Sequence, residues 1–190
     1  MFPCMIHEFD NPNFNEFKNE LIEYSYGERK KDPIGVKFSN RDGWQSNPSK
    51  VTDKNNLLHS FLVDSISNLK VIKSFINIRI VYWININPKG ARNEKHTHPS
   101  CAFAGTIWIK TPENCGNLNL YSPFSHIGSD ELSSYESNFN KSFNLNPTVS
   151  TIPKEGKMII FPSHLEHSVN ENLSNEDRIS ISFNLIIDNN

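Results

Sequence analysis

The period of the apolar positions changes near residue 76 and divides the chain into two parts. Before this point, aromatic and aliphatic residues recur at three- and four-residue intervals: Phe14, Phe17, Leu21 and Tyr24. This spacing predicts an amphipathic helix, and Asn13 and Glu16 stand where a capping pair would begin it. A second helix is predicted after the polar stretch 52–56, from a further set of apolar positions: Leu58, Phe61, Leu62 and Leu69.

Beyond residue 76 the apolar residues form short runs that are rich in β-branched and aromatic side chains. The runs are separated by Gly, Pro, Asn and Ser, and they span 76–87, 101–110, 116–121, 147–152, 156–162 and 178–187. No helix-length segment separates them, which favours antiparallel strands over βαβ units. We therefore expect a mainly β chain, in which about six to eight strands form a two-sheet jelly-roll barrel after two N-terminal helices.

The length of 190 residues suffices for one sizeable core and is short for two independent domains. We expect a single domain over 1–190, with a helical part at 1–75 and the jelly-roll core at 76–188. The connection 122–146 is rich in Ser and Asn and longer than an ordinary link between strands. It is either a lid or a surface insertion, because loop length alone does not distinguish the two.

Charge and composition argue against several classes of partner. The 21 acidic and 19 basic residues are mixed along the chain, and no run of Lys or Arg resembles a nucleic-acid-binding stripe. The N-terminus lacks the apolar core of a signal peptide, and no apolar run reaches membrane-spanning length, so we expect a cytoplasmic protein. Cys4, Cys101 and Cys115 are too widely spaced for a Cys-x-x-Cys site, so a metal would be bound by His, Asp or Glu.

His96 and His98 stand two positions apart between predicted strands and are followed by Pro99. Side chains at i and i+2 of an extended chain point to the same side, so both imidazoles can bind one ion. A third ligand must come from a strand that is distant in sequence. The stretch FPSHLEHSV offers His164 and His167 directly after the predicted strand 156–162. An isolated histidine is more often structural, and it is the pairing that favours a metal site.

Together with Arg178, these residues resemble the iron(II)- and 2-oxoglutarate-dependent oxygenases, whose core is a double-stranded β-helix. That family carries His-x-Asp/Glu, a distant second His and, ten intervening residues later, an Arg-x-Ser motif. Here ten residues separate His167 from Arg178-Ile179-Ser180. The chain is most similar to a group of oxygenase-like proteins that are frequent in marine bacteria and their phages, through motifs at 43–46, 96–99, 161–167 and 178–183.

The resemblance implies an enzyme that uses Fe(II) and the cosubstrate 2-oxoglutarate. His96, His98 and His167 would bind the metal, and Arg178 and Ser180 would bind the 5-carboxylate of 2-oxoglutarate deep in the barrel. The implied reaction consumes dioxygen, decarboxylates 2-oxoglutarate to succinate and oxidises a C–H bond, by default to the alcohol, in a small-molecule or peptide substrate. Three residues either line the pocket or belong to ordinary barrel packing and strand-end polarity: Trp108, Asn85 and Asn87.

One position departs from the family pattern, because His98 stands where the family has Asp or Glu. Three neutral imidazoles would leave the charge of Fe(II) to be balanced by 2-oxoglutarate. Alternatively, Glu94 or a loop carboxylate supplies the missing charge, and His98 then orients a water or the substrate. His164 competes with His167, but its spacing from Arg178 does not match the motif, so we assign it to the surroundings of the site or to the surface.

The cupin family is similar in the same segments. Cupins carry Gly, five residues and His-x-His, then Gly, five residues and Pro, and later a His. The interval from Gly90 to His96 matches the first part, and the interval from Gly156 to Pro162 matches the second. A cupin-like enzyme with three histidine ligands and without 2-oxoglutarate is therefore the alternative, and it does not require the Arg-x-Ser motif. A jelly-roll binding module without catalysis is a third hypothesis, since the fold alone implies no activity.

Overall fold

The computed structural model describes residues 5–50, 61–63, 65–66, 77–123, 134, 136 and 147–187. Apart from the helical residues 61–63 and 65–66, the elements are β1 His7–Asp10, α1 Phe14–Lys31, β2 Asn40–Arg41, β3 Trp44–Gln45, β4 Ser49–Lys50, β5 Ile78–Asn87, β6 Arg92–His96, β7 Phe103–Lys110, β8 Leu118–Tyr121, β9 Thr148–Thr151, β10 Lys157–Pro162, β11 His167–Val169 and β12 Arg178–Ile187.

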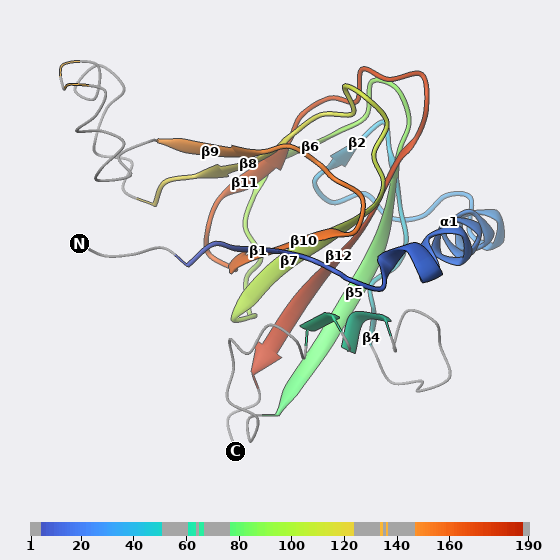
Figure 1. Cartoon of the computed structure of the whole chain (residues 1–190), viewed down its shortest axis with the longest axis horizontal. Coiled ribbons are helices and arrows are strands. Elements are labelled where there is room, and N and C mark those ends of the chain that lie inside the picture. The colour runs from blue at the N-terminus through green and yellow to red at the C-terminus, as the bar shows by residue number, and fades with distance from the viewer. Residues whose placement is uncertain are drawn as a thin grey trace.

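The strands form two antiparallel sheets that face one another (Figure 1). The larger sheet has the order β1-β10-β7-β12-β5-β3, with β4 also paired to β5, and the smaller has the order β2-β6-β11-β8-β9. Strands that are distant in sequence therefore become neighbours, as in the pairing of β12 with both β5 and β7. This arrangement confirms the predicted mainly β jelly roll.

The central strand β12 separates two environments within the fold. Its odd-numbered residues Ile179, Ile181, Phe183 and Leu185 are buried in an apolar cluster that also contains Phe14 and Leu21 of α1. Its even-numbered residues line a cavity between the sheets: Arg178, Ser180, Ser182 and Asn184. Successive side chains of a strand point to opposite faces, so one strand supplies both the packing under the helix and the polar wall of the cavity.

The first predicted helix is confirmed as α1, which lies beside the larger sheet in Figure 1. Its predicted cap is wrong, because the side chain of Asn13 makes no capping hydrogen bond. Instead, the main-chain N–H of Asn13 donates to Oδ1 of Asn11 at 2.9 Å. Of the second predicted helix, residues 61–63 and 65–66 are helical, while Leu58 and Leu69 lie outside the described residues. Most of the segment 122–146 lies outside them as well.

Six strands were not expected from the sequence: β1, β2, β3, β4, β6 and β11. They are two to five residues long and carry few apolar residues; β6, for example, has the sequence RNEKH. They are held by pairing with neighbouring strands: β11 pairs with the predicted strand β8, and β6 pairs with β11. Local sequence carries little signal for such strands, which depend on the partner strand.

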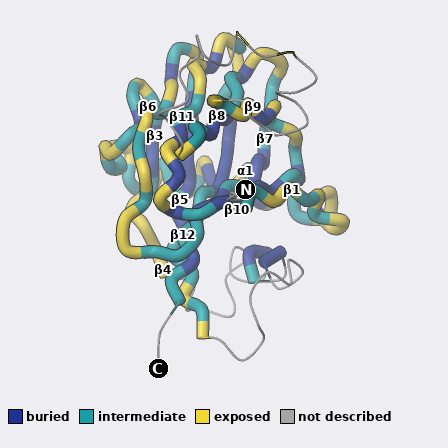
Figure 2. Tube along the Cα trace, turned by 90° about the vertical axis from the view of Figure 1, so that its left-hand side faces the viewer, coloured by how far each residue is buried: buried dark blue, intermediate teal, exposed yellow. Residues whose placement is uncertain are grey.

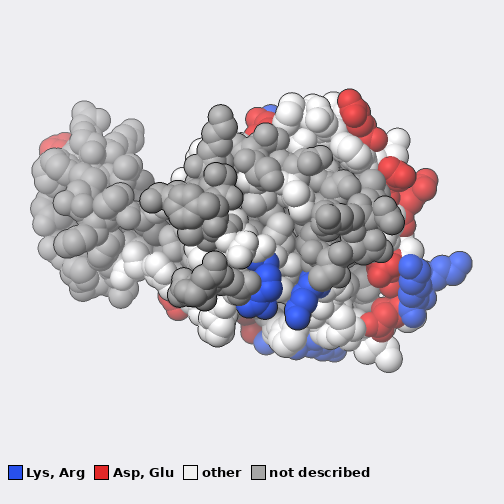
Figure 3. All heavy atoms as spheres, turned by 90° about the horizontal axis from the view of Figure 1, so that it is seen from below, with Lys and Arg blue, Asp and Glu red and all other residues white. Residues whose placement is uncertain are grey.

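Burial and charge are distributed differently over the molecule. Buried residues concentrate along the facing sheets in Figure 2, while exposed positions follow the connections and outer edges. In Figure 3, acidic and basic side chains are interspersed over the coloured part of the face that is drawn. No helix of the described residues is long and apolar enough to cross a membrane.

Candidate active site

Three of the predicted histidines come together at one end of the cavity. His96 ends β6 and His167 begins β11, and these two residues are directly opposite each other in the strand pairing. His98 follows in the loop, where its main-chain N–H donates to the carbonyl oxygen of Ser163 at 2.9 Å. One ring nitrogen from each histidine lies within 4.8 Å of the others. The competitor His164 is exposed, which agrees with its assignment to the surface.

Each of the three rings uses Nδ1 for a hydrogen bond to a carbonyl oxygen. The partners are the main-chain oxygen of Glu94 for His96 at 2.7 Å, the main-chain oxygen of Leu165 for His167 at 3.0 Å, and Oδ1 of Asn184 for His98 at 2.6 Å. A carbonyl oxygen can only accept, so each Nδ1 carries the proton and each Nε2 keeps its lone pair. The three Nε2 atoms are therefore unprotonated and suited to bind a metal, although Nε2 of His96 also lies 3.3 Å from the hydroxyl of Ser39.

Burial keeps these imidazoles neutral. It lowers the pKa of His167 to about 3 and that of His98 to about 4, and it also lowers the pKa of His96. The charged form of a histidine is disfavoured where water is removed, and the neighbouring imidazoles add to the effect. At neutral pH the lone pairs are thus not occupied by protons.

No carboxylate of the described residues joins the three histidines. Glu94 lies on β6 near them in sequence, but its side chain is exposed and forms an ion pair with Arg41. Glu166, next to His167, pairs with Lys95 at 2.7 Å on the surface. Glu94 is therefore not placed to supply the negative charge that the sequence pattern lacks.

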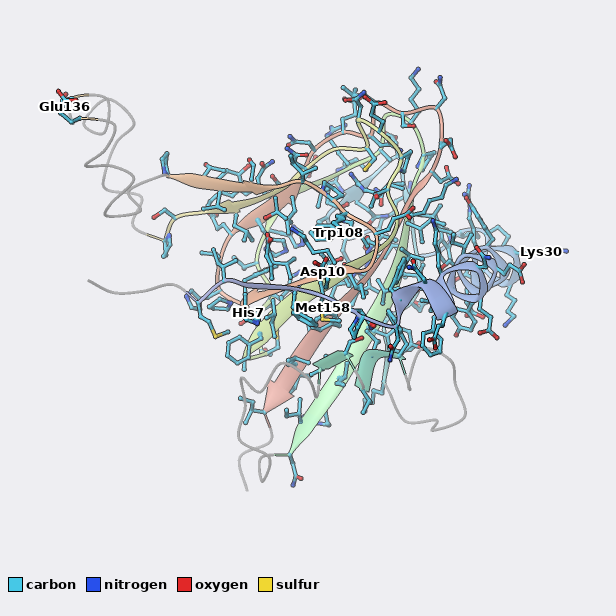
Figure 4. The ribbon with its side chains drawn as sticks, viewed as in Figure 1. His7, Asp10, Lys30, Trp108, Glu136 and Met158 are labelled. Carbon is cyan, nitrogen blue, oxygen red and sulfur yellow. The ribbon has the colours of Figure 1, made fainter. Side chains whose placement is uncertain are left out.

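The histidines open onto a cavity of about 400 Å³ between the two sheets. Its wall is built from rows of side chains in register across β5, β12 and β7. One row pairs Trp83 with Ser182 and Ser182 with Thr106, and the next pairs Asn85 with Ser180 and Ser180 with Trp108. Trp108 lies in the interior between the sheets (Figure 4). Asn85 and Trp108 line the cavity as expected, whereas Asn87 is not among its lining residues.

Arg178 occupies the buried first position of β12, and its side chain reaches the same cavity. Only 2% of the residue is exposed. Its Nη1 donates to the main-chain oxygens of Cys115, Gly116 and Asn170. Burial lowers the pKa of the guanidinium to about 10, so the group stays charged at neutral pH.

Among the described residues, no carboxylate forms an ion pair with Arg178, although buried charges are normally paired. An anion that enters the cavity would complete this arrangement. Ser180 is on the same face of β12 and its hydroxyl makes no hydrogen bond to described residues, so it is available to the same anion.

Comparison with known proteins identifies the family. The family model described as "Putative 2OG-Fe(II) oxygenase" matches residues 81–184, which is more than half of the chain. The chain belongs to this family. It is therefore an enzyme of the class that uses Fe(II) and 2-oxoglutarate, as the resemblance of the motifs implied. No curated protein matches the sequence.

Solved structures agree with the oxygenase fold. A Pseudomonas putida prolyl-4-hydroxylase is similar with a TM-score of 0.66 and 9% identity, over 98% of this chain and 94% of the other. The carbocyclase SnoK from nogalamycin biosynthesis has a TM-score of 0.66 and 12% identity, over 97% and 80%. A Trichoplax adhaerens prolyl hydroxylase, solved with a peptide fragment, has a TM-score of 0.63 and 14% identity, over 95% and 83%. At these identities the likeness concerns the fold.

The residues of this oxygenase fit both Fe(II) and 2-oxoglutarate, which its family uses. Imidazole nitrogens are common ligands of Fe(II), and three of them converge with their lone pairs unprotonated. A buried guanidinium that has no carboxylate partner among the residues with described structure fits a cosubstrate that carries a distal carboxylate.

Sequence reasoning missed several residues around the site of the oxygenase. Asn184 bonds His98, the hydroxyl of Ser39 lies 3.3 Å from Nε2 of His96, and Trp83 packs against His98 with ring centroids 5.4 Å apart. Asn184 could have been found, because it continues the alternation that places Arg178 and Ser180 on one face. No spacing or motif in the sequence pointed to Ser39 or Trp83 in the same way.

Proposed function

We propose that this oxygenase is a hydroxylase in which His96, His98 and His167 bind Fe(II), while Arg178 and Ser180 bind the 5-carboxylate of 2-oxoglutarate. The observation that carries the proposal is the shared cavity. The ring nitrogens of three histidines, close enough to share one metal ion, and a buried guanidinium without an ion-pair partner among the described residues line the same space of about 400 Å³. A metal site alone would explain the histidines but not the arginine.

The charges of the site are consistent with this cosubstrate. Three neutral imidazoles add no negative charge to a divalent ion, and Arg178 adds a further positive charge. The two carboxylates of 2-oxoglutarate would balance the guanidinium and half of the charge of the metal. The planar guanidinium suits a carboxylate because it offers parallel N–H donors, and the Ser180 hydroxyl can add one more.

When bound, Fe(II) supplies the oxidation chemistry by which 2-oxoglutarate, dioxygen and a substrate C–H group become succinate, carbon dioxide and an alcohol. The protein contributes position and exclusion of water. Trp83 and Phe161 flank His98 and His167, with ring centroids 5.4 Å and 4.8 Å apart, and limit access of solvent to the histidines.

The cavity lining favours a substrate with an uncharged reacting group. Among the described lining residues, Arg178 is the only Lys, Arg, Asp or Glu. The side of the histidines is lined by neutral and apolar residues that include Phe38, Trp83 and Pro99. We extend the proposal to a neutral moiety of a small molecule or of a peptide side chain, since a charged group would lose hydration there without gaining a partner.

The cupin-like alternative and the non-catalytic binding module share the same histidines. Neither hypothesis requires a buried arginine at the far end of the cavity. Arg178 is held by three main-chain carbonyls and has no ion-pair partner among the described residues, which favours the 2-oxoglutarate hypothesis over both.

The test is turnover of 2-oxoglutarate without any added substrate. Protein reconstituted anaerobically with Fe(II) should form succinate slowly after 2-oxoglutarate and dioxygen are added. His96→Ala should form none beyond that of Fe(II) in buffer, because two protein ligands bind a labile divalent ion weakly. The matched control is His164→Ala, which removes an exposed histidine and should behave as wild type. Absence of succinate from the wild-type protein would contradict the proposal.

A further inference from the structure

The three histidines differ in what fixes their protonated nitrogen. Main-chain carbonyl oxygens accept from His96 and His167, and a main-chain oxygen cannot become a donor. For these two rings the backbone alone leaves the lone pair on Nε2. His98 has no such partner for Nδ1, because its acceptor is the side-chain oxygen of Asn184.

An asparagine amide offers two different ends to its neighbour. With Oδ1 toward His98, the ring keeps its proton on Nδ1, and Nε2 can bind a metal. With Nδ2 in that place, the amide would donate to Nδ1, and the proton would move to Nε2 on the side of the other histidines. Only the first orientation, at an Nδ1–Oδ1 distance of 2.6 Å, is compatible with metal binding by His98.

The surroundings hold both residues in position for this contact. Asn184 lies on the central strand β12, opposite Val81 of β5 and Ala104 of β7. The ring of His98 packs against Trp83, and its main-chain N–H donates to Ser163. These contacts restrain where the ring lies, but neither of them determines which ring nitrogen carries the proton.

On the basis of the proposed metal site, we propose that Asn184 is the positioning residue that makes His98 a metal ligand, by accepting from Nδ1 and holding the lone pair on Nε2. A carboxylate at position 98 would need no such partner, because it has no tautomers. An imidazole in its place does need one, since either ring nitrogen can carry the proton. Metal binding by His98 therefore depends on the hydrogen bond that Asn184 accepts from it.

Three variants separate this role from general packing. Asn184→Leu keeps a similar size but has no acceptor, and it should weaken Zn(II) binding about 10- to 100-fold, as loss of a partner behind a metal-bound histidine typically does. Asn184→Asp can only accept, and it should bind Zn(II) as tightly as wild type or more tightly. Ser182→Ala is the matched control, because Ser182 lines the same cavity two residues earlier on β12 and does not contact His98.

The tautomer itself is measured without any metal. In the metal-free 190-residue chain labelled with ¹⁵N, the ring nitrogen shifts of His98 should report a proton on Nδ1 in wild type and in Asn184→Asp. In Asn184→Leu they should report a mixture or a proton on Nε2, while His96 and His167 stay unchanged. A change in packing alone would not alter the tautomer of a single ring.

A second background tests the coupling of the pair. With His98→Asp the third ligand has no tautomer, so adding Asn184→Leu should leave Zn(II) affinity within about twofold of His98→Asp alone. Equal Zn(II) affinity in wild type and Asn184→Leu, an equal loss in both backgrounds, or weaker binding by Asn184→Asp would overturn the inference. A wild-type protein that binds no Zn(II) or Fe(II), yet shows the expected tautomers, would instead contradict the proposed metal site.

Discussion

Replacement of Arg178 by alanine should abolish tight binding of 2-oxoglutarate and leave iron binding intact. Arg178 is 2% exposed and its guanidinium is held by three main-chain carbonyl oxygens, so it is oriented before any ligand arrives. The three histidines that would bind iron share no described hydrogen-bond partner with it, because their bonds go to Glu94, Leu165 and Asn184. The substitution should therefore weaken binding of 2-oxoglutarate without affecting binding of iron.

The magnitude follows from what the cosubstrate would lose. A 5-carboxylate buried beside an alanine would be an uncompensated charge, which costs about 3–5 kcal/mol by analogy with a broken buried ion pair. A factor of ten in Kd corresponds to about 1.4 kcal/mol, so the Kd should rise roughly 100- to 4,000-fold. Arg178→Lys should recover only part of this loss, because an ammonium is a point charge without the planar pair of donors.

The assay is an anaerobic titration of 2-oxoglutarate into iron-loaded protein, followed by the metal-to-ligand charge-transfer absorbance. Iron content is measured separately for each variant and should be equal. The matched control is Arg92→Ala, which removes an exposed arginine of β6 and should reproduce the wild-type curve. Superimposable curves for wild type and Arg178→Ala, or no absorbance change in wild type, would refute binding of 2-oxoglutarate by Arg178. Either result would favour the cupin-like hypothesis.

Three further predictions concern the ligands and the core. His167→Ala should abolish iron retention while His164→Ala retains iron, and equal iron content of the two variants after desalting would contradict the assignment. His98→Ala should weaken metal binding, whereas His98→Asp should maintain or increase it because a carboxylate restores negative charge; unchanged affinity of His98→Ala in a Co(II) titration would exclude His98 as a ligand. Phe183→Ala should lower the free energy of unfolding by about 3–5 kcal/mol, since the fully buried ring packs over Gly105; a urea midpoint equal to wild type would refute this.

Several features of the fold could be predicted because their signal is local. The helix α1 repeats apolar residues at the spacing of one face, and the longer strands are marked by β-branched and aromatic runs between turn residues. The short strands β6 and β11 were missed because they are polar and are stabilised by partners far away in sequence. The cap at Asn13 was wrong because the side chain of Asn11 already supplies an acceptor at that turn.

The sequence by itself determined the identity of the candidate ligands. Two histidines in alternation, a third at a fixed distance from Arg178, and Ser180 on the same face of its strand are properties of spacing alone. Spacing also indicated the family, whose model matches 81–184.

Only the tertiary structure decided what each face of β12 contacts. The resemblance of the motifs implied that Arg178 and Ser180 lie inside the barrel, but the alternation of polar and apolar residues did not say what covers the apolar face. In the structure the apolar face packs under α1, and the polar face forms the wall of the cavity. The pairing of His96 with His167 depends on two neighbouring strands of the smaller sheet, β6 and β11. The contact of His98 with Asn184 joins the loop after β6 to β12 of the larger sheet. Such contacts join residues that are far apart in the chain, and their free energy comes from the complete arrangement of the two sheets, so no local pattern carries them.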